Sequence, residues 1–240
     1  IIPVLIASII PIINFLLVFS YLPETKPKSN SNKLKTLLKN PLKQLLKVFE
    51  EEKIRKLSLA FFIYFIAFTG LTNILIFFLQ ESLGWTTKAS SGTLVVVGII
   101  AIIVQGGLIG PLVKQFGEMK LTLIGSGFIL VACSLLITAP KENATINIYS
   151  AVSFLAVGAG LITPTLRALI SKKLDVDRQG SILSNLQGLQ SLGGVLGIAM
   201  AGRVYDSFGP KSPFIAGSII LIFMIYLIAE GKTNNSIYDQ

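Results

Sequence analysis

The strongest constraint on this chain is the length of its apolar runs. Seven stretches of membrane-spanning length follow one another and take up most of the 240 residues. A bilayer core about 30 Å thick needs roughly 20 apolar residues of helix, and inside it every backbone polar group must be bonded internally. The sequence therefore predicts an all-α membrane protein. We place its seven transmembrane helices at residues 1–22, 57–79, 93–113, 121–139, 146–170, 182–204 and 213–229.

The composition fits this class and excludes several kinds of chemistry. Charged residues make up 14% of the chain, against about 25% in soluble domains. There is no histidine, and the single cysteine, Cys133, lies inside a predicted span. Histidine-based metal sites, Ser-His triads and internal disulfides are therefore excluded. We expect no enzymatic activity, no metal and no cofactor, because the spans carry no cluster of nucleophiles, acids or metal ligands.

The positions of the basic residues predict the orientation. Lys and Arg concentrate on the cytoplasmic side of membrane proteins. Of the 21 basic residues, sixteen fall within segment 23–56, the connections around 114–120 and 172–178, and the tail. Four lie in the alternate loops and one, Arg167, inside a span. This bias predicts a cytoplasmic C-terminus, and it explains the net charge of +9 by topology rather than by nucleic-acid binding.

The first connection, residues 23–56, is the longest and the most basic. Lys35, Lys39, Lys43 and Lys47 recur every four residues, and leucines fall largely on the opposite helical face. The pair Asn40-Pro41 favours a helix that begins there, because proline fits the first helical position. Two interpretations stay open: a basic amphipathic helix at the membrane interface near anionic headgroups, or a solvated linker helix.

Five segments carry a family resemblance. They are FSYLPETK (19–26), LGWTTKASSG (83–92), GPLVKQFGEMK (110–120), VGAGLITPTLRALIS (157–171) and DRQGSILSNLQGLQSLGGVLG (177–197). Together with the order of one span, a basic linker and six spans, they resemble spans six to twelve of the major facilitator superfamily. The last two segments are similar to spans ten and eleven of the drug–proton antiporters of tetracycline-efflux type. The third looks like a degenerate second copy of the family's cytoplasmic signature.

This resemblance implies a division of the chain into four parts. Residues 1–22 correspond to the last span of a truncated N-terminal half, and 23–56 to a basic cytoplasmic linker with an amphipathic helix. Residues 57–231 correspond to the C-terminal six-helix bundle, and 232–240 to a cytoplasmic tail. The chain opens without Met and without the basic region of a signal peptide. We therefore expect a piece cut from a longer polypeptide, with the missing N-terminal half as its partner.

Polar and aromatic side chains within the spans are the predicted substrate contacts. Polar groups at membrane depth are costly and face a cavity or another helix. A central cavity would use neutral hydrogen-bonding groups and aromatic rings, whereas the alternative role is hydrogen bonding between helices, worth about 0.6–2 kcal/mol each. The candidates are Thr69, Asn73, Phe77, Gln80, Gln105, Gln187 and Gln190. Arg167 could reach the interface, pair with Asp175 or Asp177, or bind a substrate carboxylate.

A second group of residues is predicted to serve conformational change or packing. Glycines at Gly193 and Gly197 permit close helix contact, Pro164 interrupts a helical hydrogen-bond ladder, and Gly117 supplies backbone freedom for a short turn. In the signature segment Gly110, Gly117 and Lys120 match the family pattern, whereas Lys114 stands where the pattern has Asp. The acid contacts that latch this loop in the family therefore cannot be transferred to this chain.

Three functional interpretations follow. The first is the C-terminal half of a secondary active transporter that exports a small amphipathic compound against protons by alternating access. The second is an uptake symporter of the same fold for a sugar, metabolite or other small solute, because the coupling residues would lie in the other half. The third is a non-transport membrane enzyme or scaffold. The expected partners are a small-molecule substrate and membrane lipid, and the expected location is a bacterial cytoplasmic membrane.

The predicted topology can be tested by cysteine accessibility. In a Cys133→Ala background, cysteines at positions 35, 173 and 232 should stay unlabelled by a membrane-impermeant thiol reagent on intact cells. Cysteines at positions 88, 141 and 211 should react. Labelling of position 173 together with protection of position 141 would invert the topology.

Overall fold

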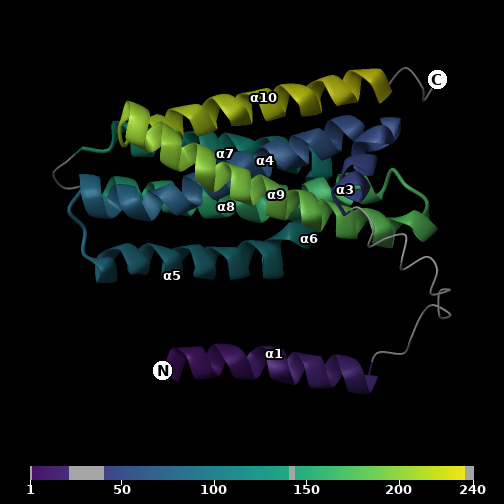
Figure 1. Ribbon diagram of the computed structural model, residues 1–240, viewed down its shortest axis with the longest axis horizontal. Coiled ribbons are helices and arrows are strands. Elements are labelled where there is room, and N and C mark those ends of the chain that lie inside the picture. Colours follow the sequence, from purple (N-terminus) through teal and green to yellow (C-terminus); the bar gives the residue numbers. More distant parts are fainter. Residues whose placement is uncertain (1, 22–40, 141–143, 236–240) are drawn as a thin grey trace. The chain divides into compact units, whose positions relative to one another are not determined.

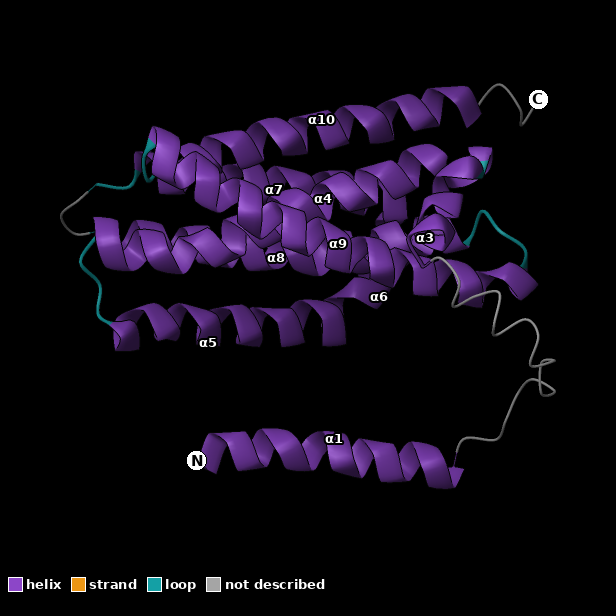
Figure 2. Ribbon diagram, viewed as in Figure 1, coloured by secondary structure: helices purple, strands orange, loops and turns teal. Residues whose placement is uncertain are grey.

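The computed structural model describes residues 2–21, 41–140 and 144–235, and every regular element among them is a helix (Figure 2). The chain divides into two compact units, 1–41 and 42–240. The first unit contains helix α1 (Ile2–Tyr21). The second contains α3 (Pro41–Glu50), α4 (Glu52–Phe77), α5 (Thr87–Ile103), α6 (Ile109–Phe116), α7 (Glu118–Thr138), α8 (Thr145–Ser171), α9 (Val176–Phe208) and α10 (Ser212–Asn235) (Figure 1).

The all-α membrane fold is confirmed, and a helix runs through the described part of each predicted span. Among the described residues, five helical stretches are long and apolar enough to cross a membrane. They are Glu52–Ser82, Thr87–Phe116, Glu118–Thr138, Thr145–Ser171 and Ser212–Glu230. Helix α9 is the longest at 33 residues, but its many Gln, Ser and Gly residues keep it below the hydropathy of the other five. In α1 the described apolar stretch is Pro11–Tyr21.

Two of the predicted spans are not uninterrupted α-helices. A π-helical segment at Phe78–Ser82 follows α4, and a second at Val104–Leu108 separates α5 from α6. A π turn inserts one extra residue and rotates the side chains that follow it. Gln80 lies in the first segment and Gln105 in the second, so neither residue is in regular α-helix.

The contact between α4 and α9 is a close backbone approach. A Cβ atom added at Gly197 would overlap the carbonyl oxygen of Ile66, and one at Gly70 would come within 2.8 Å of the Gly197 carbonyl oxygen. At Gly193 the added Cβ would lie 3.1 Å from the Phe62 carbonyl oxygen. Because lipid tails are as apolar as leucine, helices in a bilayer associate through such packing rather than through hydrophobic burial. Glycines therefore bring these two helices together.

Helices α7 and α8 form a second close pair. A Cβ at Gly158 would lie 2.6 Å from the carbonyl oxygen of Gly125. The hydroxyls of Thr122 and Thr165 are 2.8 Å apart and buried in the same contact. The α4–α9 pair and the α7–α8 pair therefore use the same device, which is small residues that let two backbones meet.

The remaining helices surround these pairs. Helix α10 packs on α4. Just beyond the end of α4, Phe78 of the π-helical segment meets Phe214 of α10 edge to face, at 5.1 Å between ring centroids. Helix α5 packs on α8. Figure 1 shows these long helices running along one common direction. The core between them contains the fully buried rings of Tyr64 and Phe61.

The short helix α3 begins at Pro41, as the Asn40-Pro41 pair predicts. Its apolar face packs on other helices of the second unit: Val48 is fully buried, and the Phe49 ring meets Phe62 of α4 at 6.5 Å between ring centroids. Leu45 lies against Gly188 of α9. The described part of the linker is therefore a bundle-bound helix rather than a solvated one. The predicted lysine stripe lies outside the described part of the structure. Lys35 and Lys39 are outside the described residues, and the side chains of Lys43 and Lys47 are outside the described side chains.

One end of the bundle carries three ion pairs. Arg178 contacts Glu51 at 2.7 Å, Lys56 contacts Glu230 at 2.7 Å, and Lys172 pairs with Glu118. Each pair joins two different helices near their ends. At the opposite end Tyr205 donates a hydrogen bond of 2.9 Å to Glu81, which links α9 to the π turn that follows α4. Polar contacts at both ends therefore join α4 and α9, in addition to the glycine contacts along their middle.

A pair of matched alanine substitutions tests the α4–α9 contact. Gly197→Ala should lower the free energy of unfolding by about 1–3 kcal/mol, because its methyl group would meet backbone that cannot yield. Gly202→Ala, in the same helix with nothing within 4 Å of the added Cβ, should change it by about 0.5 kcal/mol or less. Thermal unfolding followed through the reactivity of buried Cys133 measures both. Equal Tm values for the two variants would show that the helices do not meet closely.

Candidate functional site

The most distinctive polar cluster in the second unit is built around Arg167 of α8. Its Nη2 atom donates hydrogen bonds to the side-chain oxygen of Gln187, at 2.8 Å, and to that of Gln190, at 2.5 Å, both on α9. Its Cζ atom lies 6.0 Å from the centroid of the Phe61 ring on α4. This is the reach of a cation–π contact. Three helices therefore contribute to one cluster, which we call the Arg167 cluster: Phe61, Arg167, Gln187 and Gln190.

Helical spacing explains why these residues meet. Gln187 and Gln190 are three positions apart and so lie on one face of α9. Arg167 stands one turn after Thr163 on α8, and the Thr163 hydroxyl lies 3.3 Å from the hydroxyl of Tyr64 on α4. Tyr64 stands three positions after Phe61. The same faces of α4 and α8 thus meet twice, once through a neutral hydroxyl pair and once through the guanidinium beside an aromatic ring.

The guanidinium of Arg167 has no carboxylate partner among the described side chains. Its hydrogen-bonding partners are two neutral amides, and its Nε atom is buried without an acceptor. The predicted pairing with Asp175 is absent from the described ion pairs, and the side chain of Asp177 lies outside the described ones. Arginine stays charged in proteins, so among the described side chains two amide oxygens and the Phe61 ring face this positive charge.

The candidate residues on α4 take a different position. Thr69 faces α9, where its Cβ lies 4.0 Å from the place a Cβ would occupy at Gly194. Asn73 is exposed and donates 2.9 Å to the carbonyl oxygen of Thr69 in its own helix. Phe77 is 59% exposed. Neither Asn73 nor Phe77 holds two helices together through a described hydrogen bond, so both side chains are open to a ligand or to a further helix.

The other two candidates lie in the π-helical segments. Gln105 is exposed in Val104–Leu108, and its Cγ lies 3.8 Å from the place a Cβ would occupy at Gly160 of α8. Gln80 is half-buried in Phe78–Ser82. Short π-helical turns are frequent at functional sites. The structure joins Gln187 to Gln190 through Arg167, but no described hydrogen bond joins the candidates on α4 to that cluster.

The residues predicted to serve conformational change occupy helix contacts and a turn. Gly117 has φ of +76° and separates α6 from α7, which is the short turn that the sequence predicts. Gly193 and Gly197 lie in the α4–α9 contact, and Pro164 lies within α8. Gly110 has nothing within 4 Å of an added Cβ, and Lys120 is exposed. Their participation in a conformational change stays a prediction.

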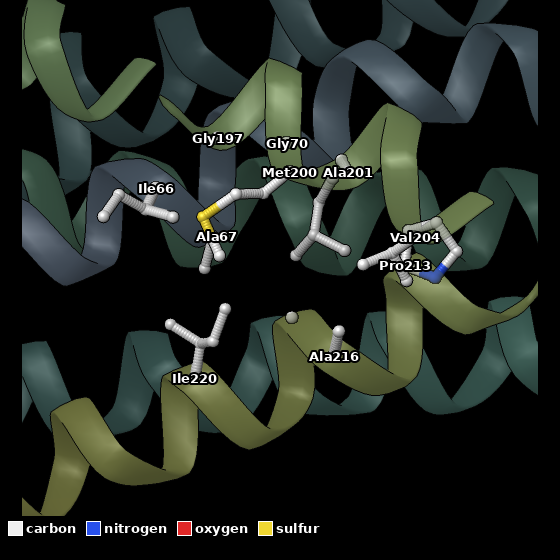
Figure 3. Close-up of a pocket in the computed structure, with 12 residues that line it drawn as sticks. Ile66, Ala67, Gly70, Gly197, Met200, Ala201, Val204, Pro213, Ala216 and Ile220 are labelled. Atoms are coloured by element: carbon white, nitrogen blue, oxygen red, sulfur yellow. The ribbon is translucent and has the colours of Figure 1, made fainter. Parts of the chain in front are cut away.

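A separate pocket lies between α4, α9 and α10 (Figure 3). Gly70 and Ala67 come from α4, Met200 from α9, and Pro213 and Ile220 from α10. Its walls are apolar, and it contains none of the predicted substrate residues. No group of three His, Cys, Asp or Glu side chains that could hold a metal occurs in the described part of the chain. The polar chemistry is therefore concentrated at the Arg167 cluster and along α4.

Sequence reasoning missed two members of this region. Phe61 and Tyr64 read as core aromatics in an apolar run, and burial does place both in the core. Their second role depends on partners about 100 residues away on α8. The signal in the sequence that could have found them is the spacing of three or four positions between aromatic and polar residues on α4, α8 and α9.

A bundle of long apolar helices with polar side chains inside its spans is an architecture found in membrane transporters. Comparison with known proteins identifies the family. Residues 2–198 match the Major Facilitator Superfamily, and the chain belongs to that superfamily.

Individual relatives support this assignment. The human Hippocampus abundant transcript-like protein 1 is 21% identical over 253 aligned residues, which cover 94% of this chain and 49% of that protein. The class C tetracycline resistance protein of Escherichia coli is 26% identical over 130 residues, 54% of this chain and 32% of its own length. The crystal structure of the human organic anion transporter MFSD10 has the same fold, with a TM-score of 0.71 at 21% identity. It aligns with 89% of this chain and 53% of its own. The chain thus spans about half the length of the longer-matched relatives.

One substitution on α4 and one on α9 can separate substrate contact from helix packing. Asn73→Leu should change the ranking or affinity of substrates of the full-length protein while leaving expression and Tm near normal, because the Asn73 side chain bonds only its own helix in the described structure. Gln187→Leu should change substrate ranking as well, with a small loss of stability from the released guanidinium. Transport competition with a dye panel and thermal melting measure the two effects. Lower Tm with unchanged ranking would show that both residues serve packing alone.

Proposed function

We propose that this chain is the C-terminal half of a secondary active transporter that exports a small amphipathic compound against protons. The observation that carries the proposal is the joint presence of superfamily membership and polar and aromatic side chains at membrane depth on α4, α8 and α9. In an alternating-access transporter two bundles rock around a site near the middle of the membrane. The Arg167 cluster and Asn73 would form part of one wall of that site.

Export is favoured by the named relatives. Tetracycline resistance proteins from Escherichia coli and Pasteurella multocida, class C and class H, match at 26% and 27% identity. We propose a bacterial cytoplasmic membrane as the location. The end with the ion pairs Glu51–Arg178 and Lys172–Glu118 would face the cytoplasm, because the basic connections lie there. The division at residues 22, 56 and 231 into span, linker, bundle and tail belongs to the same proposal.

The apolar helices and the scarcity of acids within them support a transporter whose other half carries the proton-coupling group. A coupling site needs a titratable group shielded from bulk water at depth. In the described spans the acids lie at helix ends: Glu118 begins α7, and Glu81 lies near the end of the stretch Glu52–Ser82, beside Tyr205. The proton-coupling group would therefore reside in the other half of the transporter.

A transport assay on two lengths of the protein tests this proposal. In everted membrane vesicles, the full-length protein should accumulate tetracycline or another dye-like drug when a proton gradient is imposed, and the gradient should be required. The 240-residue chain alone should show no saturable flux, because it offers one wall of the path. Saturable transport by this chain alone, or no proton-driven transport of any tested drug by the full-length protein, would refute the proposal.

A further inference from the structure

We propose that the Arg167 cluster binds an anionic group of the transported compound, most directly a carboxylate. This inference rests on the proposed transport function and narrows the substrate class to amphipathic organic anions. It follows from the charge, the depth and the hydrogen bonding of one side chain.

The first step concerns the cost of the charge. Arg167 lies within the apolar helical stretch Thr145–Ser171, four residues before its end. A charged side chain inside a span is expensive and normally pairs with another charge or lines a ligand pathway. Arg167 does not extend back toward the helix end; its guanidinium reaches sideways to the amides of α9. The protein therefore holds this charge between helices.

The second step concerns the missing counter-charge. Among the described side chains, three basic residues near the helix ends pair with a carboxylate: Lys56 with Glu230, Lys172 with Glu118, and Arg178 with Glu51. Arg167 has two amide oxygens and the face of Phe61 instead. Its Nε–H donor is buried and without an acceptor. A buried donor without a partner is costly, so the site is incomplete as it stands.

The third step concerns shape. A carboxylate accepts two parallel hydrogen bonds from a guanidinium, and this bidentate geometry makes Arg the preferred residue for carboxylate recognition. Both glutamine oxygens accept from the same Nη2 atom, and each bidentate edge of a guanidinium includes one Nη2 proton. A carboxylate would therefore bind bidentately by replacing one of the two glutamine oxygens. Since each amide oxygen faces Arg167, each amide nitrogen remains a further donor toward an anion. The Phe61 ring on α4 provides an apolar surface beside the guanidinium.

Two sources can supply the carboxylate, and they differ in a measurable way. A substrate carboxylate makes binding depend on the charge of the ligand. A carboxylate side chain from the other half of the transporter makes Arg167 a structural link, so that its loss affects charged and neutral ligands alike. We commit to the substrate as the source.

The test is equilibrium binding to the purified full-length protein by isothermal titration calorimetry. The probes are benzoate, 1-naphthoate and indole-3-acetate, each compared with its uncharged amide. At least one carboxylate should bind about tenfold or more tightly than its amide. Arg167→Gln should weaken the binding of that carboxylate by about ten- to a hundredfold, the usual effect of a lost charge-assisted hydrogen bond. The affinity for the amide should stay unchanged. Arg203→Gln, an exposed arginine near the other end of α9, is the matched control and should change neither.

A second variant keeps the test decisive if Arg167→Gln fails to fold. Gln190→Glu places a carboxylate 2.5 Å from the Arg167 donor in the present geometry. It should fold with equal or higher Tm and lose the preference for carboxylates, because the site then carries its own counter-charge. No preference in the wild type, a preference that survives Gln190→Glu, or equal weakening of acids and amides by Arg167→Gln would each overturn the inference. Drug flux measured separately distinguishes this result from failure of the transport proposal: selective anion binding without flux would refute transport and leave the anion site standing.

Discussion

The close approach of α4 and α9 is the contact on which the rest of this half depends. At Gly70 and Gly197 the two backbones come too close for a side chain, and at Gly193 the space is tight. In a bilayer, where hydrophobic burial does not drive helices together, such packing is the main source of association. Arg178–Glu51 at one end and Tyr205–Glu81 at the other hold the pair along its length. These two helices are therefore best understood as one rigid element.

That rigidity explains how a charge can be held inside the bundle. The α4–α9 element presents Phe61 on one helix and the two glutamines on the other as a fixed surface. Helix α8, joined to α7 through Gly125 and Gly158, places Arg167 against that surface. The guanidinium and the Tyr64–Thr163 hydroxyl pair are thus polar links between two close-packed helix pairs. Links made of a few hydrogen bonds can rearrange at lower cost than the glycine contacts, so a ligand would act at this junction.

The sequence predicted the membrane fold and its spans because apolar length is a local property that the bilayer imposes directly. It also predicted the Gly117 turn and the start of the linker helix at Pro41, because the backbone preferences of glycine and proline are local properties too. It did not predict the π-helical segments around Gln80 and Gln105, since a π turn depends on how neighbouring helices pack. Gln187 and Gln190 were recognisable as polar residues in a span, but their common partner was not. The glycine contacts set how α9 lies against α4 and how α8 lies against α7, and this decides which residues of α8 and α9 meet. The pattern of residues along one helix does not encode that pairing.

A disulfide cross-link measures the central contact directly. The Cβ of Thr69 lies 4.0 Å from the place a Cβ would occupy at Gly194, within the range of about 3.5–4.5 Å that a disulfide requires. In a Cys133→Ala background of the full-length protein in membranes, Thr69→Cys with Gly194→Cys should cross-link nearly completely under mild oxidation. The rate should not change with substrate or with a proton gradient. Thr69→Cys with Val195→Cys, whose native valine is 67% exposed, should cross-link far less. Absent cross-linking at 69 and 194, or a rate that changes with substrate, would contradict a rigid α4–α9 element.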